Sequence, residues 1–222
     1  METVGVIGGG QMGSQIAALA AMAGYETHVY DSDSENLKSK IKFTEDNLLN
    51  LIDKGRYEKS KLDNFKEHLH SSESIDETIN KKSFVIEAVV ERLDIKLEIF
   101  ENISKKLDEN VVLATNSSFI PASEIAKSCE HPSRFINMHF FYPPIRMDLV
   151  EISYPIETNK ETIERTQTLG KDMGRTVITC KKETPGFIVN RMLAALTDEA
   201  YQLYDEGIAD FKDIDIAIKK GL

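Results

Sequence analysis

The stretch Thr3-Val4-Gly5-Val6-Ile7-Gly8-Gly9-Gly10-Gln11-Met12-Gly13 decides the fold of this chain. A short apolar run leads directly into a G-x-G-x-x-G motif, and a small-residue helical stretch over 14–23 follows. A second strand-like run, 26–30, ends at Asp31. A glycine motif between a strand and a helix, with an acid about 20 residues further on, is the full dinucleotide-binding fingerprint.

Each motif residue has a physical task in such a site. Gly8 permits the tight turn out of the strand, Gly10 lets the backbone approach a pyrophosphate, and Gly13 lets the helix pack closely on the sheet. The N-terminus of the helix offers unpaired N–H groups to the phosphates. We therefore expect these glycines, together with Gln11 and Met12, to line a cofactor site.

Asp31 indicates which dinucleotide binds. Its carboxylate can accept hydrogen bonds from the ribose hydroxyls, and its charge would repel a 2′-phosphate. No arginine follows in the next three residues, 32–34, so NAD is favoured over NADP. The alternative is a glycine-rich turn between a strand and a helix that binds nothing.

Composition bounds the class of protein. With 222 residues, 41% of them hydrophobic and 29% charged, the chain suits one large soluble domain, or one domain plus a smaller piece. The net charge of −10 argues against nucleic-acid binding through a basic surface. We see no apolar run long enough for a bilayer and no room for a signal peptide before the first strand.

The two cysteines, Cys129 and Cys180, are far apart in the sequence. That spacing favours buried thiols in a reducing compartment, and hence a cytoplasmic protein, over a disulfide framework or a metal site.

Strand and helix patterns alternate along most of the chain, which predicts a doubly wound Rossmann-type α/β sheet. A long polar helical insertion at about 34–67 reads as an arm, and Ser32-x-x-Glu35 before it has the spacing of a capping box. Beyond 183 only helical patterns remain. We expect a dinucleotide-binding domain over 1–183 and the start of an all-helical domain over 184–222. Further strands are predicted at 68–72, 84–90, 111–115, 135–139, 149–152 and 176–179.

Ligands bind at the carboxyl ends of the strands in such a sheet, and three polar residues fall there. Glu91, Ser118 and His139 each follow or end a predicted strand. Glu151 lies on the strand after a Pro-Pro break, and a return of that kind can bring its carboxylate beside the His139 imidazole. Such a pair suits a general base that takes a proton from an alcohol.

Each of these residues also has an ordinary structural explanation. A lone histidine at a strand end is often structural, Ser118 is a possible helix cap, and Glu151 a possible solvated strand residue. Glu91 and Lys96 could be surface charges, and Asn190 could bond only within its own helix.

The motifs together resemble the L-3-hydroxyacyl-CoA dehydrogenase family, including its 3-hydroxybutyryl-CoA members. The resemblance covers essentially the whole chain. It rests on the glycine motif and on the strings Val85-Ile86-Glu87-Ala88-Val89-Val90-Glu91, Asn116-Ser117-Ser118, Met138-His139-Phe140-Phe141, Leu149-Val150-Glu151 and Thr184-Pro185-Gly186-Phe187-Ile188-Val189-Asn190-Arg191.

The resemblance implies a role for each matching residue. His139 is the general base and Glu151 its carboxylate partner, while Ser118 and Asn190 help hold the 3-oxygen and the thioester of the substrate. Asp31 holds the adenosine ribose.

The resemblance also implies the ligands and the assembly. Glu91, Lys96 and Ser118 fall on the NAD side of the cleft, and the arm falls where the family contacts CoA. It further implies an acyl-CoA substrate, a homodimer, and a place in fatty-acid and butanoate metabolism.

Two departures from the family stand out. The family usually has H-F-F-N-P where this chain has His139-Phe140-Phe141-Tyr142-Pro143, so Tyr142 takes the place of an asparagine near the nicotinamide and the substrate. The family's helical domain also continues well beyond 222. We therefore expect a shortened chain whose helix at 187–204 exposes an apolar face and promotes self-association.

Three hypotheses follow. The leading one is NAD-dependent oxidation of (S)-3-hydroxyacyl-CoA, or the reverse reaction. The second keeps the fold and takes carnitine or a sugar acid as substrate. The third is an NAD-binding protein without turnover, because the helical domain is incomplete.

Overall fold

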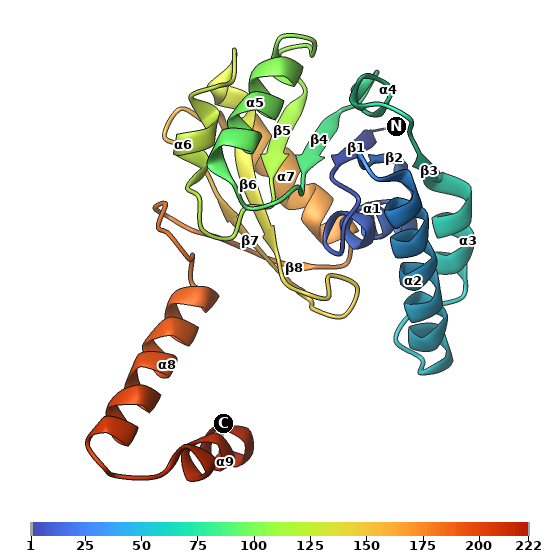
Figure 1. The fold of residues 1–222 in the computed structure, drawn as a ribbon. Helices are drawn as coiled ribbons and strands as arrows, with labels where there is room; N and C mark the ends of the chain where they lie inside the picture. The colour runs from blue at the N-terminus through green and yellow to red at the C-terminus, as the bar shows by residue number, and fades with distance from the viewer. Residues whose placement is uncertain (1, 222) are drawn as a thin grey trace.

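A computed structural model describes residues 2–221 of the chain (Figure 1). Its centre is an eight-stranded sheet with the order β3-β2-β1-β4-β5-β6-β7-β8. All neighbouring strands are parallel except β6 and β7, which are antiparallel. The strands are β1 Thr3–Ile7, β2 Glu26–Tyr30, β3 Leu69–Ser71, β4 Phe84–Glu87, β5 Val112–Thr115, β6 Phe135–Phe140, β7 Leu149–Ser153 and β8 Thr176–Thr179.

The first seven α-helices connect these strands and cover both faces of the sheet, and two more follow the last strand (Figure 1). They are α1 Gly13–Met22, α2 Ser34–Asp53, α3 Ser60–His68, α4 Ile75–Ile79, α5 Leu93–Ser104, α6 Ala122–Ala126, α7 Lys160–Asp172, α8 Val189–Asp205 and α9 Phe211–Gly221. The strand order runs one way from β1 to β3 and the other way from β4 onward, so the sheet has a switch point between β1 and β4. The predicted doubly wound fold is confirmed.

Alternating strand residues build two separate apolar layers. Phe84 and Ile86 of β4 pack in one layer with α1 and α7, whereas Val85 packs in the other with α5 and α6. The alternation follows from the period of two along a strand. Both faces of the sheet are therefore covered, and the edge at the carboxyl ends of the strands stays open for a ligand.

The predicted arm consists of α2 and α3. It has its own small core, in which Leu48, Leu62 and Phe65 pack against Met22 of α1. The predicted capping box is displaced by one residue, because Asp33 accepts the hydrogen bond from the Asn36 N–H at 2.9 Å. An aspartate suits an N-cap because its carboxylate is short enough to reach that N–H.

One strand boundary and one helix also differ from the sequence analysis. The apolar run at 84–90 leaves the sheet after Glu87, because the Val89 N–H turns back to the Glu87 carboxylate at 2.7 Å. The helix α4 was not predicted, since a single turn is too short to show a helical period.

The last two helices lead away from the sheet (Figure 1). None of the α8 residues is buried, and α9 packs back on α8 through the stacked rings of Tyr204 and Phe211, whose centroids are 3.7 Å apart. Within residues 2–221, no helix has the length and apolar character needed to cross a membrane.

Candidate functional site

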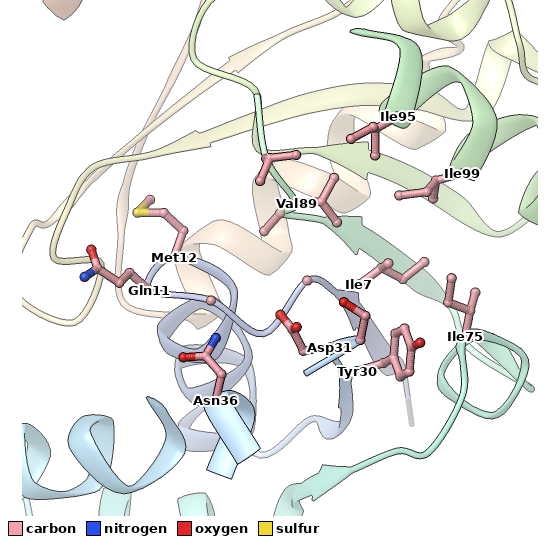
Figure 2. Close-up of a pocket in the computed structure, with 15 residues that line it drawn as sticks. Ile7, Gln11, Met12, Tyr30, Asp31, Asn36, Ile75, Val89, Ile95 and Ile99 are labelled. Atoms are coloured by element: carbon pink, nitrogen blue, oxygen red, sulfur yellow. The ribbon is translucent and has the colours of Figure 1, made fainter. Parts of the chain in front are cut away.

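A cleft of about 660 Å³ opens at the switch point between β1 and β4 (Figure 2). Gly8 has a φ of 96°, and a Cβ there would lie 2.7 Å from the Ala88 carbonyl. A Cβ on Gly13 would lie 1.7 Å from the Gly8 oxygen, whereas one on Gly10 would meet nothing within 4 Å. Two glycines thus allow close packing, and the third leaves the cleft open for a ligand.

Asp31 lies at the end of β2 and lines the same cleft (Figure 2). Its carboxylate accepts hydrogen bonds from the Gly9 N–H at 2.8 Å and from the Asp33 N–H at 3.0 Å. These bonds fix the carboxylate while leaving lone pairs free, since each carboxylate can accept about four hydrogen bonds.

The remaining walls of the cleft suit the apolar and aromatic parts of a dinucleotide. Gln11 and Met12 lie at one end, and the opposite wall contains Ile75, Val89 and Ile99 (Figure 2). The open cradle at Gly10, the anchored acid and an apolar wall together fit NAD.

A second cavity, of about 560 Å³, lies beside the first and shares Met12 with it. It lies at the carboxyl end of β5 and β6, under the first half of α8. Its walls contain Met12, Asn116, Ser118, Phe119, His139, Phe140, Phe141, Tyr142, Asn190, Leu193, Ala194, Thr197 and Asp198. Of the predicted catalytic residues, His139, Ser118 and Asn190 therefore line one space.

The antiparallel pairing of β6 and β7 places His139 directly opposite Glu151. The Nδ1 atom of His139 lies 3.0 Å from Glu151 Oε2, and the predicted contact is confirmed. Because a carboxylate only accepts, Nδ1–H donates and Nε2 keeps its lone pair. The other oxygen of Glu151 accepts from the Ile188 and Val189 N–H groups at 3.2 and 3.1 Å.

The environment of His139 keeps the imidazole neutral. Its ring is only 3% exposed, and burial lowers its pKa below 6.5 although the hydrogen bond and charge of Glu151 act in the opposite direction. Phe187 stacks on the ring with centroids 4.7 Å apart, and Phe141 packs on it at 4.6 Å. A neutral imidazole held in one orientation can accept a proton.

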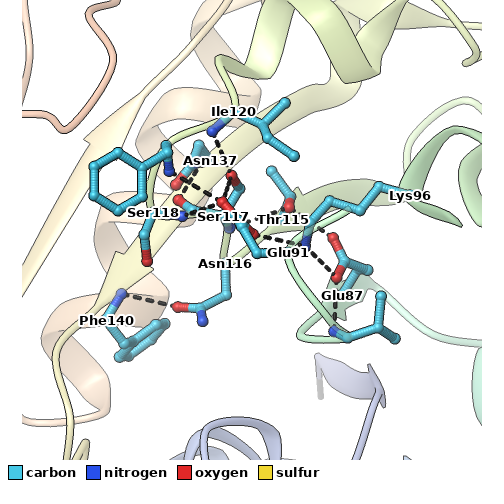
Figure 3. A network of polar contacts seen from close by, with 12 residues as sticks. Glu87, Glu91, Lys96, Thr115, Asn116, Ser117, Ser118, Ile120, Asn137 and Phe140 are labelled. Carbon is cyan, nitrogen blue, oxygen red and sulfur yellow. Dashed lines mark hydrogen bonds and ion pairs between the residues drawn. The ribbon is translucent and has the colours of Figure 1, made fainter. Parts of the chain in front are cut away.

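Glu91 anchors the turn that carries Ser118 (Figure 3). Its Oε1 accepts from the Ser117 hydroxyl at 2.5 Å and from the N–H groups of Ser118 and Phe119 at 2.9 and 3.0 Å. Burial alone would raise the pKa of Glu91, but the Ser117 hydrogen bond, the charge of Lys96 and the Phe119 N–H lower it. Glu91 is therefore a carboxylate that fixes the turn at the end of β5.

Lys96 lies behind this turn rather than on the surface (Figure 3). It is 1% exposed, and its Nζ lies 2.7 Å from Glu87 and 3.3 Å from Glu91. The Thr115 hydroxyl donates to the second oxygen of Glu87 at 2.7 Å. The surface-charge explanation is wrong for Lys96, because its side chain is buried. The two carboxylates supply the partners that a buried ammonium needs.

Two residues of the site were missed by the sequence analysis. Asn116 follows β5 and accepts from the Phe140 N–H at 3.0 Å, which ties the ends of β5 and β6 together (Figure 3). Its place at a strand end was a signal that could have found it. Phe187 lies in a string that carries the family resemblance, but its stacking on His139 depends on the tertiary fold.

Tyr142 lies at the margin of the second cavity, and its side chain is half exposed. Among the residues that the structure describes, no group of three or more His, Cys, Asp and Glu side chains is arranged to hold a metal ion.

Comparison with known families finds two matching models. Residues 3–184 match the model described as 3-hydroxyacyl-CoA dehydrogenase, NAD binding domain. Residues 186–222 match the model for the C-terminal domain of 3-hydroxyacyl-CoA dehydrogenase.

Relatives and solved structures agree with these models. The chain is 36% identical to a mitochondrial hydroxyacyl-coenzyme A dehydrogenase from Sus scrofa, covering 100% of this chain and 72% of that protein. It is 33% identical to a 3-hydroxybutyryl-CoA dehydrogenase from Clostridioides difficile, over 97% of this chain and 76% of the relative. The crystal structure of (S)-3-hydroxybutyryl-CoA dehydrogenase from Ralstonia eutropha aligns with a TM-score of 0.92 at 32% identity, over 100% of this chain and 77% of that one.

Proposed function

Because this chain belongs to the 3-hydroxyacyl-CoA dehydrogenase family, whose members are NAD-dependent oxidoreductases, we propose that His139 and Glu151 carry its reaction. The reaction is the oxidation of (S)-3-hydroxyacyl-CoA to 3-oxoacyl-CoA, or its reverse. The observation that supports this proposal is the buried pair of His139 and Glu151, joined at 3.0 Å, in the wall of a cavity that adjoins the nucleotide cleft.

In the oxidation, the substrate loses a proton from its 3-hydroxyl and a hydride from carbon 3. The Nε2 atom of His139 takes the proton, and Glu151 stabilises the imidazolium that forms. NAD supplies the hydride acceptor when it is bound. In the reverse direction the imidazolium returns the proton to the 3-oxygen.

Ser118 and Asn190 line the same cavity as His139. A hydroxyl and an amide can both donate to an oxygen, so these two residues would hold the 3-oxygen and the thioester carbonyl against His139. Glu91 and Lys96 would act one layer further out, because their contacts hold the turn of Ser118 rather than reach into the cavity.

The cofactor would lie along the first cleft. Gly10 would admit the pyrophosphate to the backbone, Gly8 and Gly13 would keep the turn and the helix close to the sheet, and Asp31 would bind the ribose. Met12 and Tyr142 would lie where the cofactor meets the substrate, since both line the second cavity and Met12 also lines the first cleft.

The direct test mixes the purified protein with NADH and acetoacetyl-CoA and follows the loss of NADH absorbance. We expect turnover that falls by about 10²–10⁴ in a His139→Gln variant, the usual contribution of positioned proton transfer. NADH binding, measured by fluorescence titration, should be unchanged in that variant. Full activity of His139→Gln would refute the assigned role.

A substrate panel separates the remaining hypotheses. Turnover of carnitine or a sugar acid with no turnover of the CoA ester would favour the second hypothesis. NADH binding without turnover of any substrate would favour a binding protein.

We also propose that the protein works as a homodimer in the cytoplasm. Support for the dimer comes from the apolar side chains that α8 and α9 leave exposed. Support for a reducing compartment comes from the two free, buried cysteines, Cys129 and Cys180.

A further inference from the structure

The loop at 141–148 joins the two strands that carry the proposed catalytic pair. It leaves β6 just after His139 and enters β7 just before Glu151. Phe141 of this loop packs on the His139 ring, and Tyr142 lines the catalytic cavity. The position of the loop therefore sets the position of two aromatic rings at the site.

A buried guanidinium holds the back of this loop. The side chain of Arg175 is almost fully buried, and its Nη1 donates to the carbonyl oxygens of Pro144 at 3.1 Å and Met147 at 2.7 Å. Its Nη2 donates to the hydroxyl of Tyr57 at 2.9 Å. Charge-assisted bonds of this kind are stronger than those between neutral groups.

Tyr57 belongs to the turn between α2 and α3, at the end of the arm. Its hydroxyl donates to the Ile145 carbonyl at 2.9 Å while accepting from Arg175. The N–H of Ile145 donates to Gln15 of α1 at 3.4 Å. Ile145 is thus held through its carbonyl from the arm and through its N–H from the helix of the glycine motif.

The neighbouring residue of the arm makes a second attachment. Arg56 donates to the Asp148 carboxylate at 2.7 Å and also to the Arg146 carbonyl. Arg146 in turn donates to Asn47 of α2 at 2.9 Å. All of these contacts join segments that are 88 or more residues apart in the sequence, so the arm and the loop are fixed to each other only by the tertiary fold.

We infer that Tyr57 is a positioning residue whose hydroxyl sets the place of the 141–148 loop, and with it the rings of Phe141 and Tyr142, in the catalytic cavity. The inference rests on the proposed function, because it takes that cavity as the place of reaction. It assigns the arm a part in catalysis through the loop, without contact between Tyr57 and the reacting atoms.

The first test measures the loop directly. The chain has no tryptophan, so a Tyr142→Trp variant places a single fluorophore on the loop. Time-resolved anisotropy of this reporter is then compared with and without Tyr57→Phe. The control is Tyr25→Phe, which also removes one tyrosine hydroxyl, in this case the one that donates to Asp172 at 2.6 Å.

We expect a larger amplitude of nanosecond motion for Tyr57→Phe than for Tyr25→Phe in the reporter background. Arg56→Gln, which releases the second attachment, should act in the same direction. Equal anisotropy decays in all three double variants would overturn the inference. This readout does not depend on turnover, so it stands even if the proposed function fails.

The second test uses activity without the reporter. Tyr57→Phe should lower kcat for acetoacetyl-CoA reduction by roughly ten- to hundredfold, because small displacements at a reacting centre have effects of that size. The KM for NADH and the midpoint of thermal unfolding should follow those of Tyr25→Phe. If kcat in Tyr57→Phe matches the Tyr25→Phe control, the inference is refuted. An inactive wild-type protein would instead refute the proposed function.

Discussion

His139 shows how three neighbours give one side chain a defined chemistry. Glu151 fixes the tautomer through a contact of 3.0 Å, while the rings of Phe187 and Phe141 pack against the imidazole. The same aromatic neighbours exclude water, and burial is the largest cause of the lowered pKa. The ring is thus neutral and oriented before any substrate arrives, which is the condition that a general base needs.

The lowered pKa of His139 predicts the pH dependence of oxidation. A base is active while deprotonated, so kcat/KM for (S)-3-hydroxybutyryl-CoA should still exceed half of its plateau value at pH 6.5, the ordinary pKa of histidine. The rate should be halved only below that pH. The measurement is a pH profile of initial rates at fixed ionic strength.

The matched variant for this profile is Glu151→Gln, which removes the charge that favours the imidazolium. Because that charge raises the pKa of His139, the half-maximal pH should move still lower and the maximal rate should fall. A half-maximal pH at or above 6.5 in the wild-type protein would contradict the prediction.

At the scale of elements, the antiparallel return of β7 against β6 makes the site. A parallel strand would have needed a long crossover, whereas the loop at 141–148 reverses the chain and sets His139 opposite Glu151. The next element, α7, then covers this part of the sheet. Its start is fixed by Asn159, whose side chain accepts from the Thr162 N–H at 2.7 Å.

This cap predicts a defined stability change. Asn159→Ala should lower the free energy of unfolding by about 1 kcal/mol, because one N–H at the helix start loses its partner. Asn159→Ser keeps a capping oxygen and should lose much less. Urea denaturation followed by circular dichroism gives both values. Equal losses for the two variants would show that the capping oxygen does not contribute to the free energy of unfolding.

For the whole molecule, the dominant feature is the contrast between the packed sheet domain and the last two helices. The strands and α1, α5, α6 and α7 share two buried apolar layers. By comparison, α8 and α9 form an apolar groove of about 310 Å³, lined in part by Leu193, Leu196, Tyr201, Phe211 and Ile218. Exposed apolar surface of this kind favours association.

We therefore expect the protein to self-associate through this groove. Leu196→Glu, at a position that is 37% exposed, should shift sedimentation velocity profiles toward the monomer. Ile156→Glu is the control, since Ile156 is 96% exposed and does not line the groove. A wild-type monomer at all concentrations, or equal effects of the two variants, would contradict this expectation.

The sequence by itself determined the features that depend on local rules. The turn at Gly8 follows from backbone sterics, and the alternation of strand and helix follows from hydrophobic periodicity. The domain boundary at 183 and the roles of Ser118, Asn190 and Tyr142 stay predictions.

Only the tertiary structure decided which side chains contact one another around the site. It buried Lys96 between two carboxylates, stacked Phe187 on His139 and placed Tyr57 of the arm behind the loop at 141–148. Phe187 and Tyr57 meet partners that are distant in the sequence, and the burial of Lys96 depends on the packing around it, so no local pattern predicts these contacts. The cofactor motif can therefore be recognised in eleven consecutive residues, 3–13. The surroundings of His139 form only when the sheet has folded.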